Sequence, residues 1–436
     1  MFTALWLFNL AVLVGLTVMA WSPKYGPLRG SAVNPLIIFV IFSLFFNINF
    51  AVFYERGTVN IFERAVPVTS VDILSGYVHY TLIFLAVAVG LIGAQITTPP
   101  HDRSTDVIAT DSRDRIITAA IFSVILLVGL VGALITLKAL ADILAGKLTR
   151  QLFFQSNPLL AVAYSLTCPG LAIYLSVRHP LKPATIAAVI GTLLILSVTG
   201  SRGIIILVGL IYAINLTVRG RSLPAYLYLF AIPILAYLLA FSRYLLRESW
   251  KFRSFADFVA FRGGFGELFF NSSEVAMAET ITVIANDPAT FSRPPFEGFL
   301  GLLMFPLPRS IFQFKPFSSP AHFTEALSPA RWLTTQTEIL TTGYGDLIMQ
   351  FGIWGALPVA AVLAFIWLRG CLRVIHRPAM HTAIWLPLFI WWMYIFMRGA
   401  VFNVGASMWP GLLACGAYYT IRHISFQTHR VTRPIG

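Results

Sequence analysis

Three arginines at the ends of apolar stretches are the first candidates for chemistry in this chain. Arg202 lies in the turn Thr-Gly-Ser-Arg-Gly between two stretches, Arg309 follows a short apolar run, and Arg398 ends a Trp-rich stretch. Lys315 follows Arg309 closely. Because a guanidinium pairs with two phosphate oxygens at once, three arginines at one membrane depth predict a diphosphate site. The alternative for each arginine alone is a side chain that extends from the apolar region to the membrane surface.

Candidate bases lie in the same half of the chain. His322 and Glu325 share the segment Ala-His-Phe-Thr-Glu, and Asp346 ends the segment Thr-Gly-Tyr-Gly-Asp. Each of these groups can take a proton from a hydroxyl within hydrogen-bond reach, so each is a candidate catalytic residue. A lone loop histidine is also compatible with no catalytic role. His79 lies inside an apolar stretch and is interpreted as a hydrogen-bonded packing residue.

Several known catalytic motifs are absent from the sequence. It contains no GxxxxGK[ST], DxD, HExxH or GxSxG pattern. A P-loop ATPase, a metal-dependent nucleotide-sugar site, a zinc protease and a serine hydrolase elbow are therefore unsupported, and we expect neither a metal nor a cofactor. The apolar stretches also lack interior acidic residues, which disfavours ion-coupled transport.

Composition shows which elements must position these residues. Of the 436 residues, 57% are apolar and only 11% are charged, which is typical of an integral membrane protein. We predict an all-α, polytopic transmembrane bundle of about eleven spans and one large external loop with short helices. The predicted spans are Phe2–Trp21, Pro35–Tyr54, Ile73–Ala94, Ile116–Leu137, Leu159–Val177, Ala184–Val198, Ile204–Val218, Leu223–Phe241, Leu347–Leu368, Thr382–Met397 and Val404–Ile421. The three cysteines predict no disulfide framework.

The net charge of +13 is unevenly distributed between the two sides of these spans. With the N-terminus outside, the cytoplasmic side carries fifteen basic and four acidic residues, a net charge of +11, and the external side carries +2. This asymmetry predicts a cytoplasmic C-terminus. The basic character is therefore an orientation signal, and a nucleic-acid partner is not expected.

Three segments follow from the pattern. Residues 1–241 form an N-terminal transmembrane bundle, residues 242–346 form a large external loop, and residues 347–436 form the C-terminal helices and cytoplasmic tail. A loop of 105 residues is usually functional or disordered, and this one is too apolar for disorder. Its run Phe296–Pro308 is too short to span and predicts an interfacial or re-entrant segment. The alternative is a surface cap without chemistry.

The chain resembles the O-antigen polymerase (Wzy-type) family, which is related to the O-antigen ligases. The resemblance covers roughly residues 195–360. Its motifs are Ser201-Arg202-Gly203 between two spans, Pro308-Arg309-Ser310-Ile311-Phe312 followed by Lys315-Pro316, and Gly345-Asp346 with Gln350-Phe351-Gly352-Ile353-Trp354-Gly355. Where Asp346 stands, the family more often has Glu.

The resemblance implies glycosyl transfer at the periplasmic face of a bacterial inner membrane. The substrates would be oligosaccharide repeat units on undecaprenyl diphosphate, and membrane lipids and a chain-length regulator would be further partners. Arg202, Arg309 and Arg398 with Lys315 would bind the diphosphate leaving group, since fixed positive charge acts where negative charge develops. His322, Glu325 or Asp346 would deprotonate the acceptor hydroxyl.

Other functions remain open at this point. The related ligase would share the arginines and prefer a strongly placed loop histidine. A lipid-linked oligosaccharide flippase or polysaccharide transporter predicts charged or polar residues along the span interiors, and the sequence shows few. A structural scaffold has no need of clustered arginines at the membrane boundary.

Overall fold

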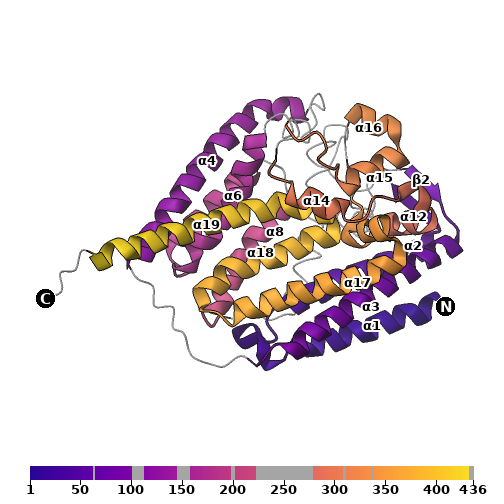
Figure 1. Cartoon of the computed structure of the whole chain (residues 1–436), viewed down its shortest axis with the longest axis horizontal. Coiled ribbons are helices and arrows are strands. Elements are labelled where there is room, and N and C mark those ends of the chain that lie inside the picture. Colours follow the sequence, from indigo (N-terminus) through magenta and orange to yellow (C-terminus); the bar gives the residue numbers. More distant parts are fainter. Residues whose placement is uncertain are drawn as a thin grey trace, which may run out of the picture. The chain divides into compact units, whose positions relative to one another are not determined.

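The computed structural model describes residues 1–61, 64–100, 112–144, 158–197, 202–221, 278–307, 311–335 and 338–431. Helices dominate this part of the chain (Figure 1). In the first half they are α1 (Phe2–Met19), the 3-10 helix η1 (Pro23–Leu28), α2 (Pro35–Arg56), α3 (Ser70–Thr97), α4 (Ser112–Leu144), α6 (Pro158–Ser176), α7 (Pro183–Ser197) and α8 (Arg202–Val218). In the second half they are α12 (Ala278–Asn286), α13 (Pro288–Phe291), α14 (Glu297–Leu303), α15 (Ser319–Leu327), α16 (Pro329–Thr335), α17 (Thr342–Ile375), α18 (Ala379–Arg398) and α19 (Val401–Val431).

One short hairpin, which the sequence analysis did not predict, interrupts the helices. Strand β1 (Thr58–Ile61) pairs antiparallel with β2 (Arg64–Pro67), with Thr58 opposite Pro67. Gly57 ends α2 in the left-handed conformation at a φ of 62°, which a glycine adopts without a Cβ penalty. The hairpin thus connects α2 to α3.

Six described helices are long and apolar enough to cross a membrane, and they identify a multi-pass membrane protein. They are Phe2–Met19, Pro35–Glu55, Ser70–Thr97, Ser112–Lys138, Thr342–Ile375 and Ala379–Arg398. Shorter apolar helices cover Val162–Ser176, Pro183–Leu196 and Ile206–Val218. The predicted helical membrane bundle is confirmed, whereas the count of about eleven spans remains a prediction; the predicted span Leu223–Phe241 lies outside the described residues.

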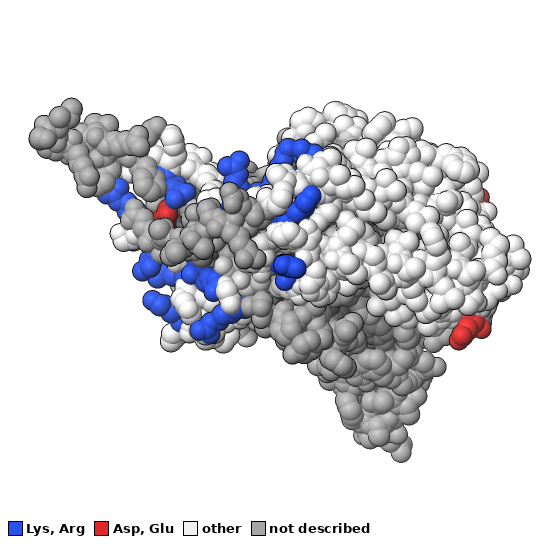
Figure 2. All heavy atoms as spheres, turned by 90° about the horizontal axis from the view of Figure 1, so that it is seen from below, with Lys and Arg blue, Asp and Glu red and all other residues white. Residues whose placement is uncertain are grey.

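Charge on the surface is consistent with this class of protein. On the face drawn in Figure 2, the Lys and Arg side chains gather in one region, and the described surface beyond it carries few charged side chains. A membrane protein needs such an uncharged area because ionised side chains are costly within the hydrocarbon region.

The chain divides into two compact units, and neither is continuous in sequence. The first comprises Met1–Pro100, Pro224–Gly370 and Met393–Gly405, and the second comprises His101–Leu223, Cys371–Trp392 and Ala406–Gly436. The predicted segments 1–241, 242–346 and 347–436 describe chain order, whereas these units describe packing. In the first unit, α1, α2, α3 and α17 lie side by side (Figure 1).

Buried polar side chains connect the first three long helices of the first unit. Asn9 Nδ2 of α1 donates to the hydroxyls of Tyr77 and Thr81 on α3, at 2.9 Å each. The Tyr77 hydroxyl donates to Asn47 Oδ1 of α2 at 2.7 Å, and Asn47 Nδ2 donates to the Tyr80 hydroxyl at 3.1 Å. In a membrane such uncharged hydrogen bonds hold helices together, and we assign this network that structural role.

Close backbone contacts join α3 to its neighbours. A Cβ on Gly90 would lie 2.1 Å from the carbonyl oxygen of Ala361 in α17, and a Cβ on Gly76 would lie 2.6 Å from Cα of Thr282 in α12. Ala278 N of α12 donates to Asn49 Oδ1 of α2 at 3.0 Å. The loop helix α12 is therefore packed against the membrane helices.

The second unit has its own core and an ion pair that includes the buried carboxylate of Asp114. Ile173 of α6, Ile384 of α18 and Tyr418 of α19 are fully buried in one apolar cluster. Arg422 of α19 donates two hydrogen bonds to the carboxylate of Asp114 in α4. Its Nε lies 2.8 Å from Oδ1, and its Nη2 lies 3.1 Å from Oδ2. This bidentate pair joins the first turn of α4 to α19.

The start of α17 has an unusual backbone that positions the candidate site. Thr342 has a φ of 63°, which is rare for a β-branched residue, and its Oγ1 accepts a hydrogen bond from Gly345 N at 3.0 Å. A Cβ on Gly343 would lie 2.6 Å from the carbonyl oxygen of Phe396. At Gly352, also at a φ of 63°, a kink separates the first turns of α17 from the rest of the span.

Candidate active site

Asp346 is the centre of a buried hydrogen-bond network in the first unit. Its carboxylate is inaccessible to solvent. Oδ1 accepts from the Ser319 hydroxyl of α15 and from Gln350 Nε2 at 2.7 Å, and Oδ2 accepts from Val401 N at 2.8 Å. Gln350 reaches the carboxylate because residues four apart share a face of a helix. Asp346 therefore connects α17 with α15 and with the first residue of α19.

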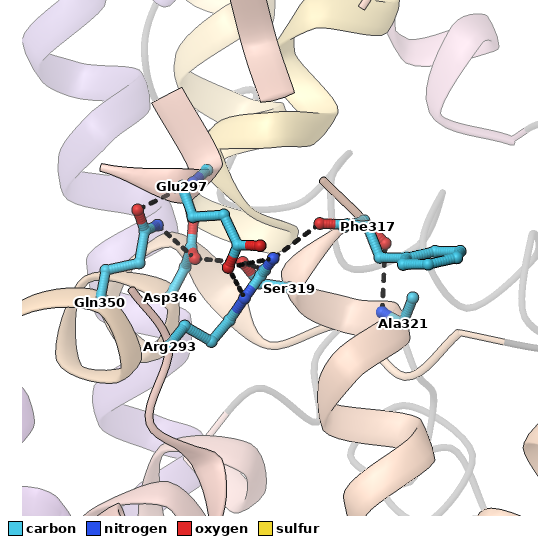
Figure 3. A network of polar contacts seen from close by, with 9 residues as sticks. Arg293, Glu297, Phe317, Ser319, Ala321, Asp346 and Gln350 are labelled. Atoms are coloured by element: carbon cyan, nitrogen blue, oxygen red, sulfur yellow. Dashed lines mark hydrogen bonds and ion pairs between the residues drawn. The ribbon is translucent and has the colours of Figure 1, made fainter. Parts of the chain in front are cut away.

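Arg293, between α13 and α14, extends this network (Figure 3). Its Nη1 donates to the Ser319 hydroxyl at 2.5 Å, and its Nη2 donates to the carbonyl of Phe317 at 2.8 Å. Nε and Nη2 each lie 2.9 Å from Glu297 Oε2. The Arg293 side chain is only 2% exposed, so its charge is balanced by Glu297 and, through Ser319, by Asp346.

Glu297 and Gln350 attach α14 to this centre. Glu297 is in the first turn of α14, where an acidic side chain also opposes the positive end of the helix dipole. Gly298 N donates to Gln350 Oε1 at 2.9 Å, and Arg293 N donates to the carbonyl of Met349 at 2.8 Å. The segment before α14 and the first turn of α14 are therefore fastened to the start of α17.

His322 lies one turn after Ser319 on α15 and is half-buried. Its ring hydrogen-bonds the backbone of Ser292. Its Nε2 is buried, and no group in the described part of the chain hydrogen-bonds it. Burial and, next, the Arg293 guanidinium lower the pKa of His322 below its usual 6.5, against the opposing effect of Glu297 and Glu325. The imidazole is therefore neutral at pH 7 and able to accept a proton.

Glu325 and Arg398 have different surroundings. Glu325, three residues after His322, is exposed to solvent. Arg398 ends α18, and its Nη1 donates to the Tyr394 hydroxyl at 3.3 Å. Gly399, the next residue, accepts a hydrogen bond from Thr341 Oγ1 at 3.1 Å. The turn that carries Arg398 is thus packed against the residues that precede Asp346.

Lys315 is hydrogen-bonded to the backbone of the segment that follows α14. Its Nζ donates to the carbonyls of Phe305 and Leu307, at 2.7 and 3.0 Å, and lies 5.2 Å from the centre of the Phe305 ring. In this arrangement the amine connects Lys315 to the backbone of Phe305 and Leu307.

The remaining predicted site residues are Arg202 and Arg309. Arg202 is the first residue of α8 and belongs to the second unit; its side chain lies outside the described part of the structure. Arg309 lies outside the described residues altogether. The structure brings together Asp346, His322 and the turn of Arg398 within the first unit.

Sequence reasoning missed Arg293, Glu297, Ser319 and Gln350. A signal was present for two pairs, since Arg293 and Glu297, and Asp346 and Gln350, are each four residues apart. Ser319 had no such signal because its partners are 26 and 27 residues away along the chain. Among the described residues, no group of three or more His, Cys, Asp or Glu could hold a metal ion.

Comparisons of the chain with family models, with curated proteins and with solved structures find no match.

Proposed function

We propose that this chain is an inner-membrane glycosyltransferase that polymerises oligosaccharide repeat units carried on undecaprenyl diphosphate. In this proposal the chain has about eleven spans, the site faces the periplasm and the C-terminus is cytoplasmic. One observation carries the proposal: a neutral, half-buried His322 with an unpartnered Nε2 is held beside a buried Arg293–Asp346 network in a loop fastened to membrane helices. Such a rigid setting is what a general base needs.

The chemistry assigns a step to each group. His322 Nε2 takes the proton of the acceptor hydroxyl, and the resulting oxygen attacks the anomeric carbon of the donor sugar. The bond between that carbon and the phosphate oxygen breaks, and the diphosphate leaves with its lipid. Arg202, Arg309 and Arg398, with Lys315, stabilise the charge on the leaving group. Glu325 is the alternative base.

Asp346 is a positioning residue in this proposal. Its carboxylate is fully buried and accepts three hydrogen bonds from α15, α17 and α19. It holds Ser319 in place, and Ser319 begins the helix on which His322 lies. A buried carboxylate with three donors supports a site without meeting the substrate itself.

A ligase that moves a finished glycan to an acceptor lipid is the second candidate. His322 keeps this candidate open, because the ligase would also use a strongly placed loop histidine. Both reactions break the same sugar–phosphate bond. They differ in product, since the polymerase extends the lipid-linked chain and the ligase transfers the completed chain away from its carrier.

Reconstitution with lipid-linked repeat units tests the proposal. We expect Arg202→Ala, Arg309→Ala and His322→Gln to abolish chain extension while the protein still inserts, and the exposed Arg29→Ala variant to keep it. Normal polymer from the first three variants would falsify these roles. Transfer of preformed glycan without extension would instead identify the ligase.

A further inference from the structure

Large apolar side chains are exposed on α14 and on the segment that follows it. We call Phe296, Leu300, Leu303, Ile311 and Phe314 the loop patch; each is between 47% and 73% exposed. Phe296, Leu300 and Leu303 share one face of the helix by their spacing. The other two residues lie on the segment that Lys315 ties to the carbonyls of Phe305 and Leu307. A patch of this kind in water marks a binding surface.

In helix α14 the small residues face the protein and the large apolar residues face outward. Its inward face carries Gly298 and Gly301, which are buried. A Cβ on Gly298 would lie 2.5 Å from Gln350 Nε2, and one on Gly301 would lie 2.3 Å from the ring of Phe402. The small residues therefore pack against the protein, and the large apolar ones point away from it. A water-facing helix has the opposite arrangement.

The loop patch continues onto the surface of a membrane-spanning helix. The Phe296 ring meets the Phe351 ring of α17 edge to face, with centroids 4.9 Å apart. One turn further along α17, Trp354 is 77% exposed, and Val362 and Ile366 are exposed beyond it. These side chains belong to a helix long and apolar enough to span the bilayer. The patch and the exposed apolar side chains of α17 thus form one apolar surface.

Two charged groups that the structure describes near the patch, Glu297 and Lys315, are engaged inside the protein. The Glu297 carboxylate binds Arg293, and the Lys315 amine binds two backbone carbonyls. Aromatic and aliphatic side chains without an opposing charge suit the boundary between lipid headgroups and acyl chains.

We propose that the loop patch is embedded in the bilayer leaflet at the end of α17 where Thr342 lies. Its occupant is the acyl-chain region of the membrane, reached continuously from α17. Helix α14 is hydrogen-bonded to Arg293 and Gln350. The embedded position of the loop patch therefore fixes the depth of the buried network relative to the lipid headgroups. The inference does not depend on the reaction proposed above.

Fluorescent labels at single cysteines test this location. Leu300→Cys and Phe314→Cys carry a bimane label, and Leu333→Cys on α16, also a highly exposed apolar position, is the matched control. The native cysteines are buried, so background labelling is low. In phosphatidylethanolamine–phosphatidylglycerol vesicles with brominated acyl chains, we expect the labels at 300 and 314 to lose most of their fluorescence. The label at 333 keeps its fluorescence and is quenched by aqueous iodide instead.

Two results would overturn the inference. Iodide quenching at 300 and 314 equal to that at 333, without quenching by brominated lipid, means that the patch faces water. Protection from both quenchers means that protein, such as a second copy of the chain, covers the patch. The labelled variants must melt at the same temperature as the unmodified protein; because Leu300 and Phe314 lie on different segments, each variant tests the location independently.

Discussion

His322 makes the stability of the chain depend on pH through its lowered pKa. In the unfolded chain its imidazole binds a proton near pH 6.5, whereas in the folded protein burial and Arg293 shift proton binding to lower pH. Above pH 6.5 both states are neutral at this residue, and its contribution is constant. As the pH falls from 6.5 through the folded pKa, the unfolded state binds the proton first and stability is lost.

We therefore expect the thermal unfolding midpoint of the wild type to fall more steeply below pH 6.5 than that of His322→Gln. Melting curves of both proteins in detergent, measured from about pH 5 to pH 8, give the comparison. Arg293, Glu297 and Glu325 face the imidazole and are present in both proteins, so the comparison isolates the loss of the imidazole. Parallel profiles would show that other groups cause the acid sensitivity.

Arg293 is expected to be the most sensitive residue of the buried network. Arg293→Ala removes the partner of Glu297 and leaves the Ser319–Asp346 pair without its balancing charge. Breaking a buried charged pair in this way costs about 3–5 kcal/mol. Denaturant titration in detergent measures the loss. The control Arg29→Ala removes an exposed arginine of the same unit and should change stability by less than about 0.5 kcal/mol.

A loss of stability from Arg293→Ala no larger than that from Arg29→Ala would mean that the network adds no stability.

Only part of this site could be predicted from the sequence. His322, Asp346 and Arg398 stand out by residue type beside apolar stretches. Arg293 does not, because its burial depends on Phe317 and Ser319, which are 24 and 26 residues away.

At the scale of elements, helix α3 depends on a glycine for its approach to α17. Gly90→Ala would place a methyl group 2.1 Å from the Ala361 carbonyl oxygen, so the two helices must separate. Overpacking of this kind costs about 1–3 kcal/mol. Gly15→Ala in α1 is the matched control, since nothing lies within 4 Å of its added Cβ. We expect this control to be neutral or stabilising by about 0.5–1 kcal/mol, because alanine loses less backbone entropy in a helix.

Thermal melting of both glycine variants in detergent measures the difference. Equal midpoints for Gly90→Ala and Gly15→Ala would contradict the close contact of α3 with α17.

The long helices could be predicted with approximate bounds, whereas the short helices of the loop were expected only as a class and without bounds. Predicted spans such as Pro35–Tyr54 and Ile116–Leu137 lie within α2 and α4, because a lipid-crossing segment must be apolar over its whole length. The predicted span Leu347–Leu368 lies within α17, which begins five residues earlier, at Thr342, where Gly343 packs against Phe396 and Asp346 accepts a hydrogen bond from Val401 N. Helix α14 has seven residues and depends on packing of its glycines, which no local periodicity reveals.

At the scale of the whole molecule, charge asymmetry makes a prediction that the helices alone do not. Length and apolarity are the same for either orientation of a span. They therefore identify a multi-pass protein but do not show which side of the membrane each loop faces. The predicted net charge of +11 on one side supplies that direction. Exposed residues on each predicted side provide positions for a test: Leu333 lies in the predicted external loop, and Arg377 lies in a predicted cytoplasmic turn.

Cysteine labelling tests this orientation directly. A membrane-impermeant maleimide should label Leu333→Cys in sealed, right-side-out membranes and should label Arg377→Cys only after permeabilisation. The native cysteines are all buried, so the unmodified protein is the negative control. The reversed labelling pattern would mean that the chain has the opposite orientation in the membrane. Labelling of both positions without permeabilisation would mean that an even number of spans separates them. Either result would contradict the cytoplasmic assignment of Arg377 and would remove the charge argument for a periplasmic site.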